Sequence, residues 1–141
     1  MDFENSFALK FSAKSSNEGF ARTAVAMFLL QYDPLSSTLN DIKTAVSEAV
    51  TNSVIHGYEN KEGDIYLSCG VKEGMVYIEI ADRGKGIEDI KQAMEPLFTT
   101  KPDEERSGLG FTVMESFMDS IEVESQKGKG TKVSMTKSLL G

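Results

Sequence analysis

Apolar and polar residues alternate in five stretches of the chain, which is the pattern of half-buried β-strands. Residues 72–74 (Lys-Glu-Gly) are short enough to join the second and third stretches as a hairpin. A second pair of strands faces each other across residues 126–130. The apolar members of these strands are Phe7, Leu9, Phe11, Ile65, Leu67, Cys69, Val71, Val76, Ile78, Ile80, Ile121, Val123, Val133 and Met135.

Helical spacing is found between the strands. Ser15, Ser16 and Asn17 offer N-cap chemistry for a helix reaching to about Tyr32, where Asp33-Pro34 ends it. This helix is almost entirely apolar or small over residues 20–30. We therefore expect it to be buried on more than one side, against the sheet and against a second subunit.

A second helix is predicted over residues 36–57, with Ser36, Ser37 or Thr38 as its cap and Gly57 as its C-cap. Its apolar stripe consists of Leu39, Ile42, Val46 and Val50. A short helix over residues 88–94 and a polar, mobile loop over residues 96–106 are predicted next. The last helix begins near residues 107–110, with Phe111, Met114, Phe117 and Met118 on its apolar side.

Helices that lie on one face of a hairpin-built sheet define an α+β, two-layer sandwich. We predict one domain over residues 1–141, with a mixed sheet and helices on one face. The length of 141 residues suits a single domain with a sizeable core.

Polar residues at a spacing of four mark the second helix as a candidate site. Glu48, Asn52 and His56 form a row along one helix face, rotated away from the apolar stripe. A carboxylate can accept a proton, and an amide oxygen can bind a hard cation such as Mg²⁺. Taken alone, such a row is more often a solvated face, and His56 is more often a packed or capping residue.

Composition excludes several functions. The chain has 15 basic and 22 acidic residues, a net charge of −7, which argues against direct nucleic-acid binding. A protein partner with a basic surface remains compatible with this charge. Cys69 is the only cysteine, so it forms no intramolecular disulfide, and one Cys with one His is too few for a structural zinc site. Without a signal-like start or a membrane-spanning stretch, we expect a soluble, cytoplasmic protein.

Two glycine motifs suggest a nucleotide site. Asp82-x-Gly84-x-Gly86 places an acceptor at a strand end beside backbone that a flat ligand can approach, and such an acceptor suits the amine of adenine. Residues 107–110 (Ser-Gly-Leu-Gly) open a helix after Lys101 and Arg106, which favours polyphosphate binding. Each motif alone also fits an ordinary turn or tight packing.

The order of these motifs resembles the Bergerat-fold (GHKL) ATP-binding family, which includes gyrase, heat-shock protein 90, histidine kinases and mismatch-repair ATPases. Residues 47–52, 96–102 and 105–111 strongly resemble the serine-kinase anti-sigma factors, closest to those of sporulation. That resemblance covers nearly the whole chain. It implies a dimer that binds a sigma factor of the sigma F type and phosphorylates a serine of an anti-anti-sigma protein.

The resemblance also implies roles for single residues. Glu48 would orient or deprotonate the serine, Arg106 would stabilise the transferring phosphoryl group, and Asn52 would bind Mg²⁺. ATP would be held by Asn52, Asp82, Gly84, Gly86, Thr99, Thr100, Lys101, Ser107, Gly108, Leu109, Gly110 and Thr131. Independently of the resemblance, Arg22 is the only charge on the apolar stretch of the first helix. It fits slightly better as a side chain that simply reaches water, and the alternative is that Arg22 and the nearby Glu18 contribute to a partner surface.

Three functions remain open at this point. The first is a serine kinase that also binds a sigma factor. The second is an ATP-gated sigma-factor binding protein without significant kinase activity, and the third is a stand-alone ATPase in which Glu48 activates water. The presence of Glu48 one turn before Asn52 favours an active enzyme over the ATP-gated binding protein. The apolar first helix favours a protein substrate over a stand-alone ATPase.

Overall fold

The computed structural model describes residues 2–87, 94 and 110–140. The predicted mobile loop and nearly all of the predicted helix over residues 88–94 lie outside these ranges. In chain order, the described elements are β1 (Asn5–Ser12), α1 (Asn17–Leu29), the 3₁₀ turn η1 (Leu30–Tyr32), α2 (Ser36–Asn52), the π-helical turn η2 (Ser53–Gly57), β2 (Asp64–Lys72), β3 (Met75–Asp82), α4 (Gly110–Phe117), β4 (Ser120–Gln126) and β5 (Gly130–Ser138).

The five described strands form one sheet in the order β1-β2-β3-β5-β4. Each of the four pairings is antiparallel, so the prediction of a mixed sheet is wrong in that respect. The connection between β2 and β3 is the predicted tight hairpin. Its two central residues, Glu73 and Gly74, have φ angles of 51° and 76°, as a type I′ turn requires.

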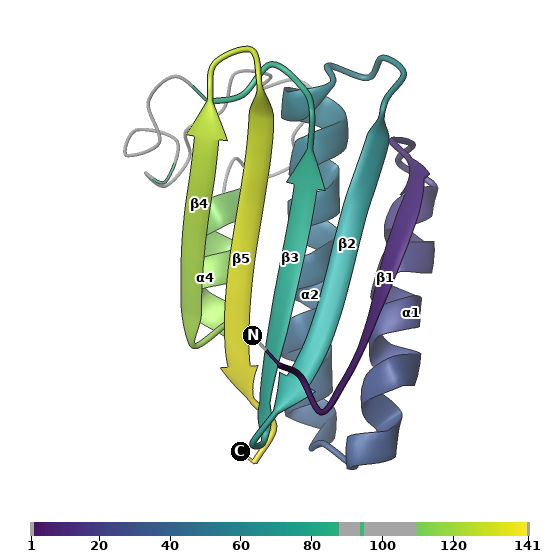
Figure 1. Ribbon diagram of the computed structural model, residues 1–141, viewed down its shortest axis with the longest axis vertical. Coiled ribbons are helices and arrows are strands. Elements are labelled where there is room, and N and C mark those ends of the chain that lie inside the picture. Colours follow the sequence, from purple (N-terminus) through teal and green to yellow (C-terminus); the bar gives the residue numbers. More distant parts are fainter. Residues whose placement is uncertain (1, 88–93, 95–109, 141) are drawn as a thin grey trace.

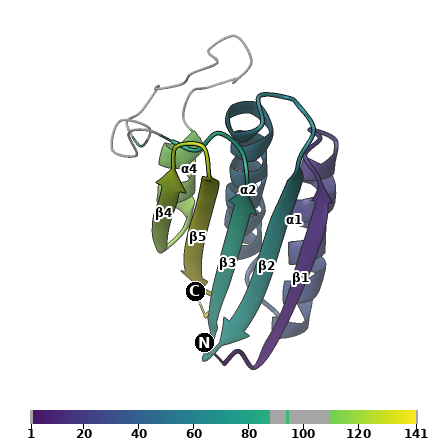
Figure 2. The ribbon, with the colours of Figure 1, turned by 45° about the horizontal axis from the view of Figure 1, so that its top comes forward.

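Helices α1, α2 and α4 all lie on one face of the sheet (Figure 1), and the turned view in Figure 2 shows the same two layers. The α+β, two-layer architecture is therefore confirmed. The other face carries alternating small and polar residues such as Ser68, Glu79 and Lys132, which matches the period of two along each strand. In the described part of the chain, no helix is long and apolar enough to cross a membrane.

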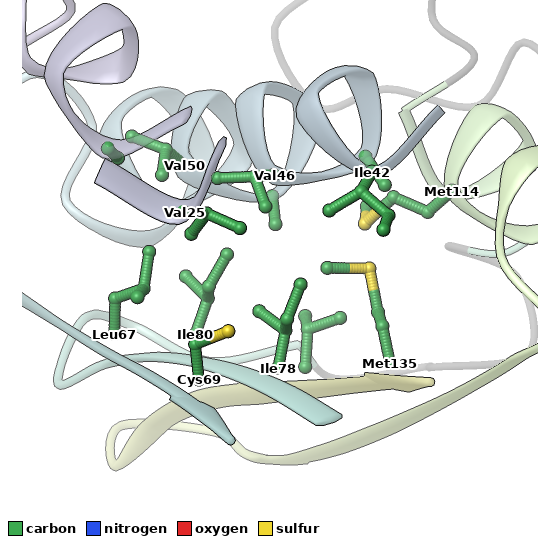
Figure 3. Packing of buried hydrophobic residues seen from close by; sticks show 14 of the residues in the cluster. Val25, Ile42, Val46, Val50, Leu67, Cys69, Ile78, Ile80, Met114 and Met135 are labelled. Carbon is green, nitrogen blue, oxygen red and sulfur yellow. The ribbon is translucent and has the colours of Figure 1, made fainter. Parts of the chain in front are cut away.

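The core lies between the two layers (Figure 3). Ile42, Val46 and Val50 of α2 are completely buried and point toward the strands, as the predicted stripe requires. Ile78 and Ile80 of β3 meet them from the sheet. Close packing of these branched side chains fixes α2 over the centre of the sheet.

Cys69 is part of this core, with 1% of its surface exposed. Burial raises the pKa of its thiol from 9.0 to about 12. The thiol stays protonated at neutral pH, which confirms the interpretation of Cys69 as a small core residue.

The predicted helix caps are not the ones that form. Ser16 precedes α1 without a side-chain capping bond, and Asn17 instead donates to the carbonyl of Ser12. Helix α2 follows Leu35, so the predicted capping residues at its start lie inside its first turn. The predicted stop after α1 is confirmed, because Asp33 adopts a left-handed φ of 50° after η1.

Helix α1 is buried on one side only within this chain. Ala21, Val25 and Leu29 are fully buried, whereas Phe20 and Met27 are 52% and 66% exposed. Phe20 on the exposed side lies next to β1, because the rings of Phe20 and Phe11 have centroids 6.2 Å apart. Within this chain, the side of α1 that faces the sheet is buried, and the side expected to face a second subunit is exposed.

Candidate functional site

The centre of the candidate site is the buried carboxylate of Asp82. It is the last residue of β3, on the side that faces the helices, and 6% of its surface is exposed. Its two oxygens accept hydrogen bonds from Ser53 Oγ (2.8 Å) and from the backbone N–H of Gly84 (2.9 Å). Burial raises the pKa of the Asp82 carboxyl above 3.8, while these donors and the Thr131 backbone act in the opposite direction.

Ser53 lies on the buried side of α2, three residues after Val50, and from there its hydroxyl reaches Asp82. The helix continues past Asn52 as η2, where the N–H of Tyr58 donates to the carbonyl of Ser53 (2.9 Å), an i+5 bond. Single π-helical turns of this kind are frequent at functional sites. Of the predicted row, Glu48 and Asn52 lie in α2, and His56 lies within η2.

Gly57 and Gly84 bring two backbone segments into direct contact at the site. A Cβ on Gly84 would overlap the carbonyl of Gly57, and one on Gly57 would lie 2.9 Å from Asp82 Oδ2. The N–H of Lys85 donates to the same Gly57 carbonyl (2.9 Å). Gly57 does not have the positive φ of a C-cap glycine, so the predicted C-cap is wrong. A glycine is needed here because Asp82 packs directly against its Cα.

Gly86 brings the same segment into contact with the turn between β4 and β5. Its φ angle is 77°, and a Cβ would overlap the carbonyl of Gln126. The N–H of Ile87 donates to Ser125 Oγ (2.7 Å), and that of Gly128 donates to the carbonyl of Lys85 (2.5 Å). The segment after β3 is therefore joined to the turn between β4 and β5.

Asn52, the last residue of α2, has an unsatisfied group. Its Nδ2 is buried and has no hydrogen-bond partner among the residues that the structure describes. An unpaired buried donor costs about 1–3 kcal/mol, so its presence favours a ligand with an acceptor at this position. Glu48 lies one turn earlier on α2 and is half-buried.

These residues fit Mg²⁺ bound together with phosphates. The described part of the chain has no group of three or more His, Cys, Asp or Glu that could hold a metal. Mg²⁺ commonly uses one or two protein oxygens and completes its shell with phosphates and water. The amide of Asn52 could supply such an oxygen, and its Nδ2 could donate to a phosphate.

Thr131 lies beside Asp82, its direct partner in the β3–β5 register. Its hydroxyl is 2.8 Å from Ser125 Oγ. The structure thus brings together Asp82, Gly84, Gly86 and Thr131 at one end of the sheet, with Asn52 at the end of α2. This is the end drawn at the top of Figure 1, where β3 finishes.

The remaining predicted site residues are placed as follows. Gly110 is buried and begins α4. Glu18 and Arg22 are joined by a 2.6 Å ion pair on α1, with side chains 31% and 39% exposed. Outside the described residues lie Thr99, Thr100, Lys101, Arg106, Ser107, Gly108 and Leu109.

Sequence reasoning did not assign a role to three residues of this region: Ser53, Tyr58 and Ser125. The hydroxyl of Tyr58 donates to the Asp64 carbonyl (2.6 Å) and accepts from the Arg83 N–H (2.8 Å), which ties η2 to β2 and β3. Ser125 could have been found, since it is a polar residue at an inward position of an alternating strand. Ser53 continues the buried stripe of α2 three residues after Val50, but its partner is 29 residues away and could not be identified from that spacing.

Comparisons with known proteins identify the fold and the domain family of the chain. Residues 11–137 match the histidine kinase-like ATPase domain. Among solved structures, the RsbU and RsbW domains of Rv1364c from Mycobacterium tuberculosis align with a TM-score of 0.70 at 20% identity, over 96% of this chain and 32% of that one. The catalytic domain of histidine kinase ThkA aligns with a TM-score of 0.57 at 16% identity, over 99% and 98%. At these identities the two solved structures establish the fold alone. The family match over residues 11–137 establishes that the chain contains a histidine kinase-like ATPase domain.

Curated relatives define the family more closely. An anti-sigma F factor of Clostridium botulinum (strain Eklund 17B / Type B) is 61% identical over 136 residues, which cover 96% of this chain and 95% of the relative. One of Thermoanaerobacter sp. (strain X514) is 58% identical over 137 residues, with coverages of 97% and 96%. The chain belongs to the anti-sigma F factor family, and the resemblance to anti-sigma factors is confirmed.

The buried carboxylate leads to a prediction about pH. Because the folded-state pKa of Asp82 is raised above 3.8, the folded state binds its proton more tightly than the unfolded state, and stability falls as pH rises through that pKa. Asp82→Asn cannot ionise. The unfolding free energy of the variant minus that of wild type should therefore increase from about pH 4 upward, measured by urea unfolding at a series of pH values. A difference that is constant or decreases over this range would contradict the burial argument.

Proposed function

We propose that the chain is an anti-sigma factor that binds and inhibits a sporulation sigma factor of the sigma F type. We also propose that residues 1–141 form one ATP-dependent serine kinase domain, which phosphorylates and inactivates an anti-anti-sigma partner. The observation that supports this best is the presence of both a buried acceptor, Asp82, and a buried donor, Asn52 Nδ2, that has no partner among the described residues, in a chain of the anti-sigma F factor family.

ATP would lie with adenine against Asp82, Gly86 and Thr131. Its phosphates would lie near Asn52 and the start of α4, where Gly108, Leu109 and Gly110 would offer N–H groups. Lys101 and Arg106, with Thr99, Thr100 and Ser107, would complete the phosphate side. Bound Mg²⁺ would supply charge neutralisation for the phosphates, with Asn52 as a protein ligand.

Glu48 would act on the incoming serine. A new bond would form between the serine oxygen and the γ-phosphorus while the bond to the ADP oxygen breaks. The serine proton would pass to the Glu48 carboxylate, one turn from Asn52 on the same face of α2. Arg106 would stabilise the charge on the transferring group.

A homodimer is supported by the exposed side of α1. Phe20, Met27 and Leu30 are 52%, 66% and 56% exposed and follow helical spacing, an unusually apolar surface for a helix facing water. Strand β1 beside them is an edge of the sheet. We propose that this side of α1 faces the second subunit, which is the side left uncovered within the chain.

The sigma factor would bind through charge as well as shape. The net charge of −7 complements a basic, nucleic-acid-binding partner. Glu18 and Arg22 form an ion pair on α1 that contributes at most about 1 kcal/mol to folding at this exposure, so both side chains could re-pair with a partner at little cost.

The kinase reaction is tested with Glu48→Gln. We expect phosphate transfer to an anti-anti-sigma protein to fall about 10²-fold or more, because the general base is lost, while ATP affinity stays within a few-fold. Transfer is measured with radiolabelled Mg-ATP, and affinity by calorimetry. Glu122→Gln, an exposed glutamate on the far side of the sheet, is the matched control and should transfer phosphate normally.

Other outcomes of this assay would assign a different function. Tight ATP binding and a nucleotide-dependent sigma-factor complex without any label on the partner would indicate an ATP-gated binding protein. Free phosphate without label on either protein would indicate an ATPase. Equal losses of transfer and of ATP affinity in Glu48→Gln would contradict the role of Glu48 as a base.

The dimer is tested with Met27→Glu. A buried methionine contributes about 1.5–3 kcal/mol, so its replacement by a charge should weaken dimerisation at least about tenfold. Sedimentation velocity over a dilution series measures this. Leu140→Glu, at an apolar residue that is 85% exposed at the other end of the chain, is the control. Unchanged dimerisation in Met27→Glu would place the interface elsewhere.

A further inference from the structure

Ser125, Thr131 and Asp82 form one row across three strands. Ser125 pairs with Thr131 between β4 and β5, and Thr131 pairs with Asp82 between β5 and β3. Directly paired residues have side chains on the same side of a sheet. All three therefore point toward the helices, at the end of the sheet where the candidate site lies.

The hydrogen bonds of Ser125 determine where the proton of Thr131 goes. A serine hydroxyl has one proton and two acceptor positions. Its proton is donated to the carbonyl of Gly130 (2.9 Å), which can only accept. One acceptor position is taken by the N–H of Ile87 (2.7 Å). The 2.8 Å contact with Thr131 Oγ1 is thus satisfied only if Thr131 donates and Ser125 accepts.

Thr131 consequently has no proton left for a ligand. Its oxygen can only accept, and the neighbouring Asp82 carboxylate already accepts from Ser53 and Gly84 and has further acceptor positions. Paired side chains in an antiparallel sheet have Cβ atoms about 5 Å apart. The two N–H bonds of a primary amino group reach acceptors at about the same separation, given N–H···O distances of about 2.9 Å.

We propose that Ser125 is a positioning residue for base selection. Because Ser125 accepts the hydrogen bond of the Thr131 hydroxyl, Thr131 and Asp82 both face the ligand as acceptors, and this pair selects a 6-amino purine over a 6-oxo purine. This inference rests on the proposed binding of adenine at Asp82. A 6-oxo group would bring a third acceptor against two others, with no donor between them. Without Ser125, the hydroxyl of Thr131 is free to turn and donate to the 6-oxo group.

The test compares Mg-ATP with Mg-ITP, whose base has a 6-oxo group and an N1–H in place of the 6-amino group and unprotonated N1 of adenine. Calorimetry gives both dissociation constants, and their ratio, ITP over ATP, measures selection. We expect Ser125→Ala to lower this ratio about fivefold, the effect of one neutral hydrogen bond. Ser125→Thr, which keeps the hydroxyl, should restore the wild-type ratio.

Ser120→Ala is a matched control. Ser120 and Thr136 form a second hydroxyl pair between the same two strands, 2.5 Å apart, but on the exposed face. Its loss should leave the ratio unchanged. Should Ser125→Ala not fold, Ser125→Cys keeps the size of the side chain while accepting only weakly, and should lower the ratio in the same direction.

A double variant separates positioning from general support. In a Thr131→Val background, Ser125→Ala should not change the ratio further, because there is no hydroxyl to orient. A ratio that stays at the wild-type value in Ser125→Ala, even with both affinities weakened equally, overturns the role of Ser125 while leaving ATP binding intact. Absence of ATP binding in wild type would instead overturn the proposed function itself.

Discussion

The burial of one carboxylate constrains everything around the site. Asp82 is at a strand end under the last turns of α2, and it is held by two neutral donors, Ser53 and the Gly84 N–H. Removing a carboxylate from water is unfavourable, which is why its pKa is raised and why each oxygen has a donor. The glycines at positions 57 and 84 allow these donors to come close enough.

Helix α2 contributes to both the core and the site, because its apolar stripe and its polar residues Glu48 and Asn52 lie on different sides of the helix. Ile42, Val46 and Val50 of its apolar stripe are fully buried against the sheet, so the helix cannot shift without exposing that surface. The same packing holds Asn52 and Glu48 at the end of the sheet. The unpaired Nδ2 of Asn52 is therefore held in place by the core, ready for a ligand acceptor.

Much of the fold follows from local patterns in the sequence. Alternation identified all five described strands, and the stripe from Leu39 to Val50 identified the buried side of α2. Alternation gives no strand direction, so the fully antiparallel pairing was not predicted. The helix caps were also missed, because serines near a helix start have other partners available, as does Asn17 with the Ser12 carbonyl.

The site was less predictable than the fold. Asp82, Asn52 and the glycine motifs were found because their spacing resembles a known family. Ser53 matters through a contact to Asp82 at the end of β3, 29 residues away, which no period in the sequence reports. Ser125 matters through the number of protons and acceptors in its network, which becomes visible only when Ile87, Gly130 and Thr131 are placed around it.

The most direct test of this account is a crystal structure with Mg²⁺ and a non-hydrolysable ATP analogue. The account predicts that the 6-amino group of adenine lies within hydrogen-bonding distance of Asp82, with Asn52 at the metal and phosphates. The carboxylate of Asp82 should keep its bonds to Ser53 and Gly84. An analogue bound away from the end of β3, or an adenine that makes no contact with Asp82, would contradict the central claim.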